Sequence, residues 1–331
     1  MTKFDRLKIQ FSAEYLNEWD KYETYYDHTR KSKKYDSYKL VKGYLDDHLG
    51  LNHVLYKETD TEDLIDIEFT PKILRENYFK LISRDTIREC LENIIKTGLI
   101  DFDIDSVLLN SRVLSLDATC DIKSPIPVND AILALQYISI NESYYIRDHN
   151  RSNFEIYYGA ADDSPRLKFY NKFREIKRFP EKFPIDCDKK HFEDILRVEV
   201  EIRDFQSISK YLKITKKDGY FNLQDVLNTD SKVVLEVINT FTMKKDFFIS
   251  KSPTSMTAAE REKDEHMKNV IMQVDYDINK LMLYLKMIKG FRNVKIKNRY
   301  INKLNELRFS KFSEEFNILN EFKDLIEKSY S

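Results

Sequence analysis

Residues 195–203 (ILRVEVEIR) show the clearest β-strand pattern in the chain, because apolar and charged side chains alternate along them. Successive side chains of a strand point to opposite faces of its sheet. The branched apolar side chains of this segment therefore share one face, which we expect to cover a core. The other face carries four charged side chains, which are Arg197, Glu199, Glu201 and Arg203.

Six further segments before residue 204 have strand signals, and two helical segments interrupt them. The predicted strands are 4–12, 51–57, 63–69, 112–122, 153–159 and 165–172. The last two flank the turn-rich residues AADDS and are expected to form a hairpin. The predicted helices are 83–98 and 127–139. This order predicts an α+β fold with an antiparallel sheet, whereas residues 13–50 give no clear assignment.

The sequence changes character after residue 204. Residues 222–241 and 258–331 have mainly helical patterns, and a Ser-, Pro- and Thr-rich segment at 250–262 lies between them. A length of 331 residues allows one large domain or two ordinary ones. We therefore predict an α+β domain over residues 1–215 and a helical domain over residues 216–331.

The composition is that of a globular protein, with 42% hydrophobic residues, 6 Gly and 7 Pro. The net charge of −1 counts against a protein that coats nucleic acid by charge alone, but it allows a local basic groove. Cys90, Cys120 and Cys187 are far apart and form no CxxC pair, which suggests reduced thiols. No segment resembles a signal peptide or a membrane helix, so we expect a cytoplasmic protein outside membranes.

Acidic side chains gather on two of the predicted strands. Asp117 and Asp121 are four residues apart on the 112–122 strand and therefore share a face. If this strand lies beside the 195–203 strand, Glu199 and Glu201 join them in one patch. Hard cations such as Mg²⁺ and Mn²⁺ bind such groups of carboxylate oxygens. The alternative is a solvated face with ion pairs between strands.

Tyr170 lies between two lysines on the 165–172 strand, where Lys168 and Lys172 are expected to share its face. Nearby ammonium groups favour a phenolate, which can attack phosphorus and form a covalent intermediate. The alternative is a packing role, as for most of the 21 tyrosines. Together with the carboxylate patch, the segment supplies a nucleophile, a metal site and phosphate-binding cations, as metal-assisted phosphoryl transfer requires.

The order of these segments resembles that of the filamentous-phage gene II/X replication initiators and, more distantly, of Rep_trans plasmid initiators. The likeness covers most of residues 1–215. The segments that carry it are DRLKIQF near the N-terminus, IEFTPKIL (67–74), LDATCDI (116–122), LKFYNK (167–172), LRVEVEIR (196–203) and KYLK (210–213).

The resemblance implies a rolling-circle replication initiator. Such an enzyme nicks one DNA strand at an origin, forms a 5′-phosphotyrosyl link, releases a 3′-OH primer and later rejoins the strand. It implies that Tyr170 is the nucleophile, with Lys172 as its neighbouring cation. The implied metal site for Mg²⁺ or Mn²⁺ contains Asp117, Glu199 and Glu201, with Asp121 as a further candidate. Glu68 and Lys72 fall in a matching segment, and the implied partners are origin DNA, a host helicase and a polymerase.

Basic residues in the C-terminal region are candidate DNA contacts, because phosphate contacts dominate protein–DNA affinity. We expect Lys295, Lys297 and Arg299 to contact DNA, together with Arg197 and Arg203 of the strand. The alternative is a helical packing domain with a charged exterior.

Two features depart from known initiators. Leu74 is followed by Arg-Glu-Asn rather than by a Gly-His-Asn type sequence, and the chain has no His-hydrophobic-His pair. A mobilisation relaxase with the same chemistry, a non-catalytic DNA-binding regulator and a structural α+β protein remain alternatives. A second tyrosine, such as Tyr157, Tyr158 or Tyr211, is a further candidate for strand transfer.

Overall fold

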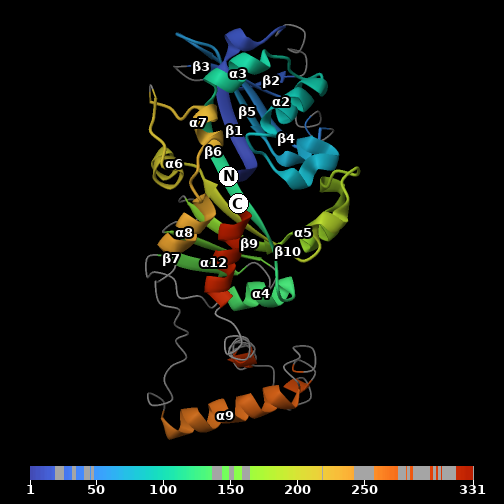
Figure 1. Ribbon diagram of the computed structural model, residues 1–331, viewed down its shortest axis with the longest axis vertical. Helices are drawn as coiled ribbons and strands as arrows, with labels where there is room; N and C mark the ends of the chain where they lie inside the picture. The colour runs from blue at the N-terminus through green and yellow to red at the C-terminus, as the bar shows by residue number, and fades with distance from the viewer. Residues whose placement is uncertain are drawn as a thin grey trace.

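A computed structural model describes most of the chain (Figure 1). The described residues are 1–18, 26–31, 35–40, 45, 48–135, 144–148, 153–158, 165–217, 219–241, 257–274, 281, 284–285, 299–300, 303–304, 307 and 318–330. Within them, ten strands form one sheet in the order β2-β3-β4-β5-β1-β6-β10-β9-β8-β7, and each pair of neighbours is antiparallel. The predicted α+β class with an antiparallel sheet is therefore confirmed.

The strands agree with the predicted segments and add three more. The strands are β1 Lys3–Ser12, β2 Tyr26–Lys31, β3 Tyr35–Leu40, β4 Leu51–Thr59, β5 Leu64–Phe69, β6 Arg112–Lys123, β7 Tyr144–Asp148, β8 Asn153–Tyr158, β9 Arg166–Asn171 and β10 Ile195–Ile202. β8 and β9 form the predicted hairpin. β2 and β3 lie in the region that gave no assignment, and β7 extends the sheet beyond β8.

The described residues also form α-helices and 3₁₀ segments. The α-helices are α2 Ile87–Lys96, α3 Ile104–Asn110, α4 Val128–Leu135, α5 Lys172–Arg178, α6 Phe205–Leu212, α7 Leu223–Leu227, α8 Val233–Phe241, α9 Ala258–Gln273 and α12 Ile318–Ser329. The 3₁₀ segments are η1 Ala13–Tyr15, η3 Pro71–Lys80, η4 Pro180–Lys182 and η5 Lys189–Phe192. The mainly helical pattern predicted for residues 222–241 corresponds to two helices, α7 and α8, with residues 228–232 between them.

Helices α4, α8 and α12 contact the central strands β6, β9 and β10 (Figure 1). Leu196, Val198, Val200 and Ile202 of β10 are fully buried, as the alternation in residues 195–203 predicted. They belong to one hydrophobic cluster with side chains of α8 and α12, including Val237 and Phe322. Burial of this apolar surface is the main force that holds the helices on the sheet.

The C-terminal end of the chain packs against the sheet beside the N-terminus. The α-amino group of Met1 donates a hydrogen bond to the carbonyl of Tyr330 at 2.7 Å, and the two termini lie side by side in Figure 1. The Tyr330 hydroxyl accepts a hydrogen bond from the backbone N–H of Val234, and Ser329 contacts Cys120 of β6. A second cluster, which includes Val270 and Ile271 of α9 and Leu304, is separate from the sheet core. The division at residues 215 and 216 stays a prediction.

The first strand contains a β-bulge at Asp5. The pairing of β1 with β6 shifts between Phe4, which is opposite Ala118, and Arg6, which is opposite Asp117. A bulge inserts one extra residue and re-aims side chains. Asp5 is consequently directed toward Arg197 on the charged face, while its neighbour Phe4 is fully buried in the core.

Within the part of the chain that the structure describes, no helix combines the length and the apolar character that crossing a membrane requires.

We expect Ile326→Ala on α12 to lower the free energy of unfolding by about 2–5 kcal/mol, because Ile326 is only 1% exposed within the sheet core. Lys328→Ala on the exposed side of the same helix is the matched control, with an expected change within about 0.5 kcal/mol. Urea unfolding followed by circular dichroism measures both. Equal effects of the two substitutions would show that α12 does not pack on the sheet in solution.

Candidate active site

The charged faces of β6 and β10 lie side by side, as the carboxylate patch requires. In the register of these strands, Glu201 is opposite Asp117, and Arg197 is opposite Asp121. On its other side β10 pairs with β9, which sets Arg197 opposite Tyr170 and Glu199 opposite Lys168. One face of three strands therefore collects the side chains that the sequence singled out.

Most carboxylates of this patch have a cationic partner. Arg6 donates to both oxygens of Asp117, at 3.2 Å from Nε and 2.8 Å from Nη2. Lys168 Nζ lies 2.8 Å from Glu201 Oε2, and Arg203 also pairs with Glu201. Burial alone would raise the pKa of Glu201, but Lys168 and Arg203 lower it to about 2. The expected repulsion between these carboxylates is thus offset by side chains of the protein itself.

Arg197 lies at the centre of the patch and is 0% exposed. Its Nε and Nη2 bind the two oxygens of Asp121 at 2.5 and 2.7 Å, and its Nη1 binds Asp5 Oδ1 at 2.6 Å. Its guanidinium carbon lies 5.8 Å from the centroid of the Tyr78 ring and 5.9 Å from that of Phe192. This burial disagrees with the expected DNA contact, because its polar atoms are engaged with protein carboxylates. Arg197 instead positions the strands around Tyr170.

The Tyr170 side chain lies beside a carboxylate and an ammonium group. Its hydroxyl donates a hydrogen bond to Glu199 Oε1, and Lys172 Nζ lies 3.4 Å from the Tyr170 oxygen. Lys172 is not on the strand as predicted, because α5 begins there and Asn171 caps it by accepting from the N–H of Arg174 at 3.0 Å. Lys168, two residues before Tyr170, pairs with Glu201 instead.

The pKa of Tyr170 differs from the expectation drawn from its two lysines. Burial and the carboxylate of Glu199 raise the pKa of Tyr170 well above 10, so the hydroxyl keeps its proton at rest. Burial and the neighbouring Asp5 raise the pKa of Glu199 to about 8. Burial and Arg197 alone would lower the pKa of Lys172, but Tyr78, Asp5 and Glu175 raise it above its ordinary value.

Asp5 is a site residue that the sequence reasoning missed. Burial alone would raise its pKa, but Arg197, Lys172 and a hydrogen bond with Glu199 lower it. Asp5 and Glu199 therefore form a carboxyl pair beside the tyrosine. A signal was present in FDRLKIQF, because Phe4 and Leu7 are three residues apart while the later apolar residues are two apart. That interruption of the alternation marks the bulge.

The η3 segment brings Lys72 toward this pair. Burial and the charge of Lys172 lower the pKa of Lys72, which also interacts with Asp5. The position of η3 depends on Gly50, because a Cβ there would lie 2.3 Å from the backbone nitrogen of Ile73. Glu68, the other candidate from IEFTPKIL, lies 3.4 Å from Arg6 Nη1 at the edge of the patch.

A cavity of about 810 Å³ opens beside Tyr170 and Glu199. Its walls come from β8, β9 and α5, and most of the charged side chains in them are basic. The other lining residues are Asn153, Lys168, Asn171, Arg174, Glu175, Lys177, Arg178 and Phe179. Tyr170 and Glu199 therefore line a space whose charge suits a phosphate-containing substrate.

The described residues contain no group of three or more His, Cys, Asp or Glu side chains arranged to hold a metal ion. Asp117, Asp121 and Glu201 already have cationic partners. The Asp5–Glu199 pair fits a divalent cation better, because one proton now offsets the repulsion between two carboxylates. Mg²⁺ is often bound by one or two carboxylates together with water and substrate phosphates.

The structure describes only some of the other residues that were predicted to contact DNA. Arg203 is 52% exposed at the end of β10, and Arg299 is exposed near α9. Lys295 and Lys297 lie outside the described residues, so their role stays a prediction. Lys303 is buried and lies 2.5 Å from Asp264, which indicates a packing role.

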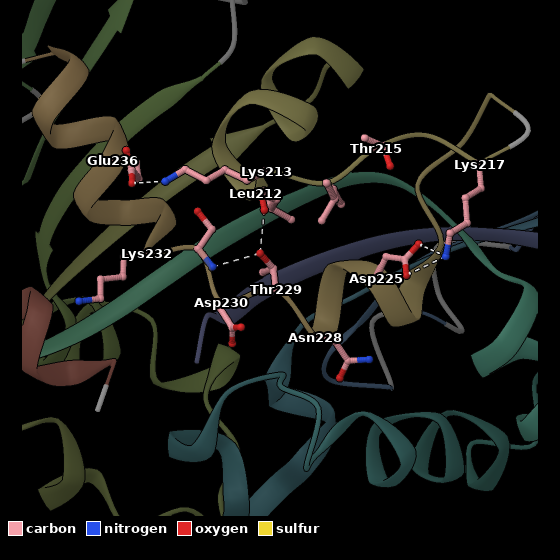
Figure 2. A pocket seen from close by; sticks show the side chains of 12 residues that line it. Leu212, Lys213, Thr215, Lys217, Asp225, Asn228, Thr229, Asp230, Lys232 and Glu236 are labelled. Atoms are coloured by element: carbon pink, nitrogen blue, oxygen red, sulfur yellow. Dashed lines mark hydrogen bonds and ion pairs between the residues drawn. The ribbon is translucent and has the colours of Figure 1, made fainter.

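A second cavity, of about 730 Å³, lies between α6, α7 and α8 (Figure 2). Lys213 binds Glu236 at 2.7 Å, and Lys217 binds Asp225. The Thr229 hydroxyl donates to the carbonyl of Leu212 at 2.8 Å. The polar groups of this second cavity are engaged with one another and hold α6, α7 and α8 together. The cavity beside Tyr170 is therefore the stronger candidate for an active site.

The sequence matches no protein-family model, and it matches no curated protein. A search of solved structures finds a likeness to the rolling circle replication initiator protein from Geobacillus stearothermophilus. The two chains are 13% identical, with a TM-score of 0.39, and the match covers 76% of this chain and 89% of the other. At this level of similarity, the function depends on the geometry of the chain's own residues.

We expect Arg197→Met to lower the free energy of unfolding by about 3–5 kcal/mol, because it leaves the partly buried carboxylates of Asp5 and Asp121 without their cation. Arg203→Met, directly after the same strand, is the matched control and should cost less than about 1 kcal/mol, since Arg203 is half exposed. Denaturant unfolding measures both values. A cost for Arg197→Met no larger than that of the control would refute the central position of this ion pair.

The raised pKa of Glu199 predicts a pH dependence of stability. The folded protein keeps this proton up to about pH 8, whereas an ordinary glutamate releases it near 4.5. The stabilisation of the folded protein by this bound proton is thus fully present below pH 4.5 and is lost as pH rises through 8. With metal chelated, the wild type should lose on the order of 2 kcal/mol more than Glu199→Gln between pH 5 and 8.5.

Thermal or urea unfolding across this pH range measures that difference. Subtracting the Glu199→Gln curve removes other titrations, including that of His53, whose pKa burial lowers to about 4. Parallel curves for the two proteins would mean that Glu199 has an ordinary pKa.

Proposed function

We propose that the protein is a DNA strand-nicking enzyme of the rolling-circle initiator type, with Tyr170 as its nucleophile. The observation that carries this proposal is the position of the Tyr170 hydroxyl, which lies between the Glu199 carboxylate and the Lys172 ammonium group. Tyr170 lines a cavity in which most of the charged side chains are basic. The groups needed for attack on a phosphodiester therefore surround one oxygen atom.

The first step transfers the tyrosine proton. Because the pKa of Tyr170 is raised, the phenolate forms only as the proton moves to Glu199, which acts as a general base in its ionised form. The Tyr170 oxygen forms a bond to phosphorus, and the bond from phosphorus to the 3′ oxygen breaks. The proton that Glu199 received passes through water to the 3′ oxygen, which leaves a free 3′-OH, a 5′-phosphotyrosyl enzyme and Glu199 ionised again. Rejoining reverses these steps.

Fixed cations stabilise the charge that develops during this attack. The ammonium group of Lys172 remains protonated and lies 3.4 Å from the tyrosine oxygen. Its position is held by Glu175, whose Oε2 lies 2.7 Å from Lys172 Nζ. Arg174 and Lys177 in the cavity wall supply further positive charge to phosphate oxygens. Preorganised charges of this kind usually give the largest contribution to such reactions.

A divalent cation, Mg²⁺ or Mn²⁺, would be held by Asp5 and Glu199, and its chemistry there is the polarisation of the scissile phosphate. Of the four predicted ligands, this proposal keeps Glu199 and gives Asp117, Asp121 and Glu201 a structural role. Those three carboxylates hold Arg6, Arg197 and Lys168 in place on the charged face.

Action at a replication origin follows from the order of the sequence segments that resemble phage and plasmid initiators. A mobilisation relaxase would perform the same chemistry on a transfer origin. A non-catalytic regulator is less favoured, because both the nucleophile and its base are present in one hydrogen-bonded pair.

The test is formation of a covalent adduct between the protein and DNA. Wild-type protein is incubated with Mn²⁺ and a set of single-stranded oligonucleotides from candidate origins, and the products are separated on a denaturing gel. We expect an adduct with the wild type and a loss of at least 100-fold in its rate with Tyr170→Phe, because the attacking oxygen is removed. Glu199→Gln should slow the reaction by about 10²–10⁴-fold through loss of the base.

Tyr157→Phe is the matched control, because Tyr157 lies on the neighbouring strand β8 of the same sheet, opposite Arg166. It should form the adduct at the wild-type rate. An adduct that survives Tyr170→Phe but not Tyr157→Phe would move the nucleophile to β8. Tyr211 is buried in α6 and is not a candidate for transfer in this structure.

A further inference from the structure

Phe179 is an exposed aromatic side chain in the wall of the active-site cavity. It follows directly after the last residue of α5 and lines the same cavity as Tyr170. Its side chain is 37% exposed, whereas the apolar residues on either side of it in sequence, Ile176 and Phe183, are buried. Those two residues pack in a small cluster with Tyr78 and Phe192. The cluster is formed without Phe179, so packing does not explain its position.

Two cations flank the ring of Phe179. The guanidinium carbon of Arg178 lies 5.1 Å from the ring centroid, and Lys182 Nζ lies 5.0 Å from it. The small cluster beneath holds this segment in place, because Phe183 packs against both Tyr78 and Phe192. The ring is therefore a partly exposed aromatic surface next to two positive charges, in a segment that the small cluster anchors.

An aromatic face between cations has the chemistry that binds unpaired nucleotides. Bases stack on aromatic rings, and the flanking cations bind the phosphates on either side. A base inside a duplex is already stacked and cannot use such a surface without being unpaired. A peptide partner would match the ring but would not make use of the basic residues Arg174, Arg178 and Lys182 around it.

We propose that Phe179 is a stacking platform for one unpaired DNA base next to the phosphate that Tyr170 attacks, with Arg178 and Lys182 binding the flanking phosphates. This inference depends on the proposed nicking function and deepens it. It makes Phe179 a positioning and specificity-determining residue, because it favours a melted or single-stranded site over duplex DNA. The platform lies in the same cavity as the nucleophile, so a stacked base fixes the adjoining phosphate.

The test uses Tyr170→Phe protein as background, so that DNA binds without being cut. The probe is an oligothymidylate of about 12 nucleotides with one central 2-aminopurine, whose fluorescence is quenched by stacking. We expect Phe179→Ala to weaken binding about 10-fold, equivalent to about 1.4 kcal/mol, and to remove the quenching. Phe179→Tyr should keep both, and a duplex of the same length should bind all variants equally.

Ile185→Ala is the matched control, because Ile185 is 91% exposed in the same segment and is not among the residues that line the cavity. It should bind the probe like the background protein. If Phe179→Ala binds and quenches like the background while Arg178→Ala binds less tightly, the contact is by charge alone and the stacking proposal is overturned. Weaker binding with unchanged quenching would also overturn it.

The adduct assay separates this result from a failure of the nicking proposal. On single-stranded DNA, protein with an intact Tyr170 and Phe179→Ala should form the adduct with a raised KM and a kcat within about 3-fold of wild type. A wild-type adduct together with unchanged KM for Phe179→Ala refutes the platform but leaves the nickase in place. No adduct with wild type and no binding of the probe refutes both.

Discussion

The charged face of the sheet depends on one buried cation. Arg197 has no contact with solvent, so its charge is stable only because Asp5 and Asp121 bind three of its nitrogens. These bonds join β10 to β6 and to the bulge of β1. A shift of one residue in any of these strands would turn the paired side chains to the apolar face. The ion pairs of Arg197 with Asp5 and Asp121 therefore fix the register of the strands, and every distance around Tyr170 depends on that register.

The candidate active site lies where this compensation of charge is incomplete. Glu201 is matched by Lys168 and Arg203, which lower its pKa. Asp117 is paired with Arg6, although burial still raises the pKa of Asp117. Glu199 instead lies against Asp5, and its pKa is raised to about 8. A carboxylate that shares its site with another carboxylate can take up a proton or bind a cation. The same strand thus holds one acid that is structural and one that is suited to proton transfer.

The sequence predicted which side chains share a face, because strand periodicity depends only on local alternation. Glu199 and Glu201 were placed on one face in this way, and Tyr170 on one face with Lys168. The structure sets these two faces side by side. It did not predict which charges pair, because partners are chosen across strands. Lys168 was expected to lower the pKa of Tyr170, yet it binds Glu201. The bulge at Asp5 and the packing of α12 on β6 also depend on contacts between distant parts of the chain.

The change from strand to helix at Asn171 determines which side chains surround the Tyr170 hydroxyl. In a strand, side chains near Tyr170 would alternate and only every second one would face the cavity. Because α5 begins at Lys172, this lysine lies 3.4 Å from the tyrosine oxygen as the first residue of a helix. The following turn carries basic residues into the cavity wall and ends at Phe179. One short segment therefore supplies the nucleophile, its cation, the phosphate-binding wall and the exposed aromatic ring.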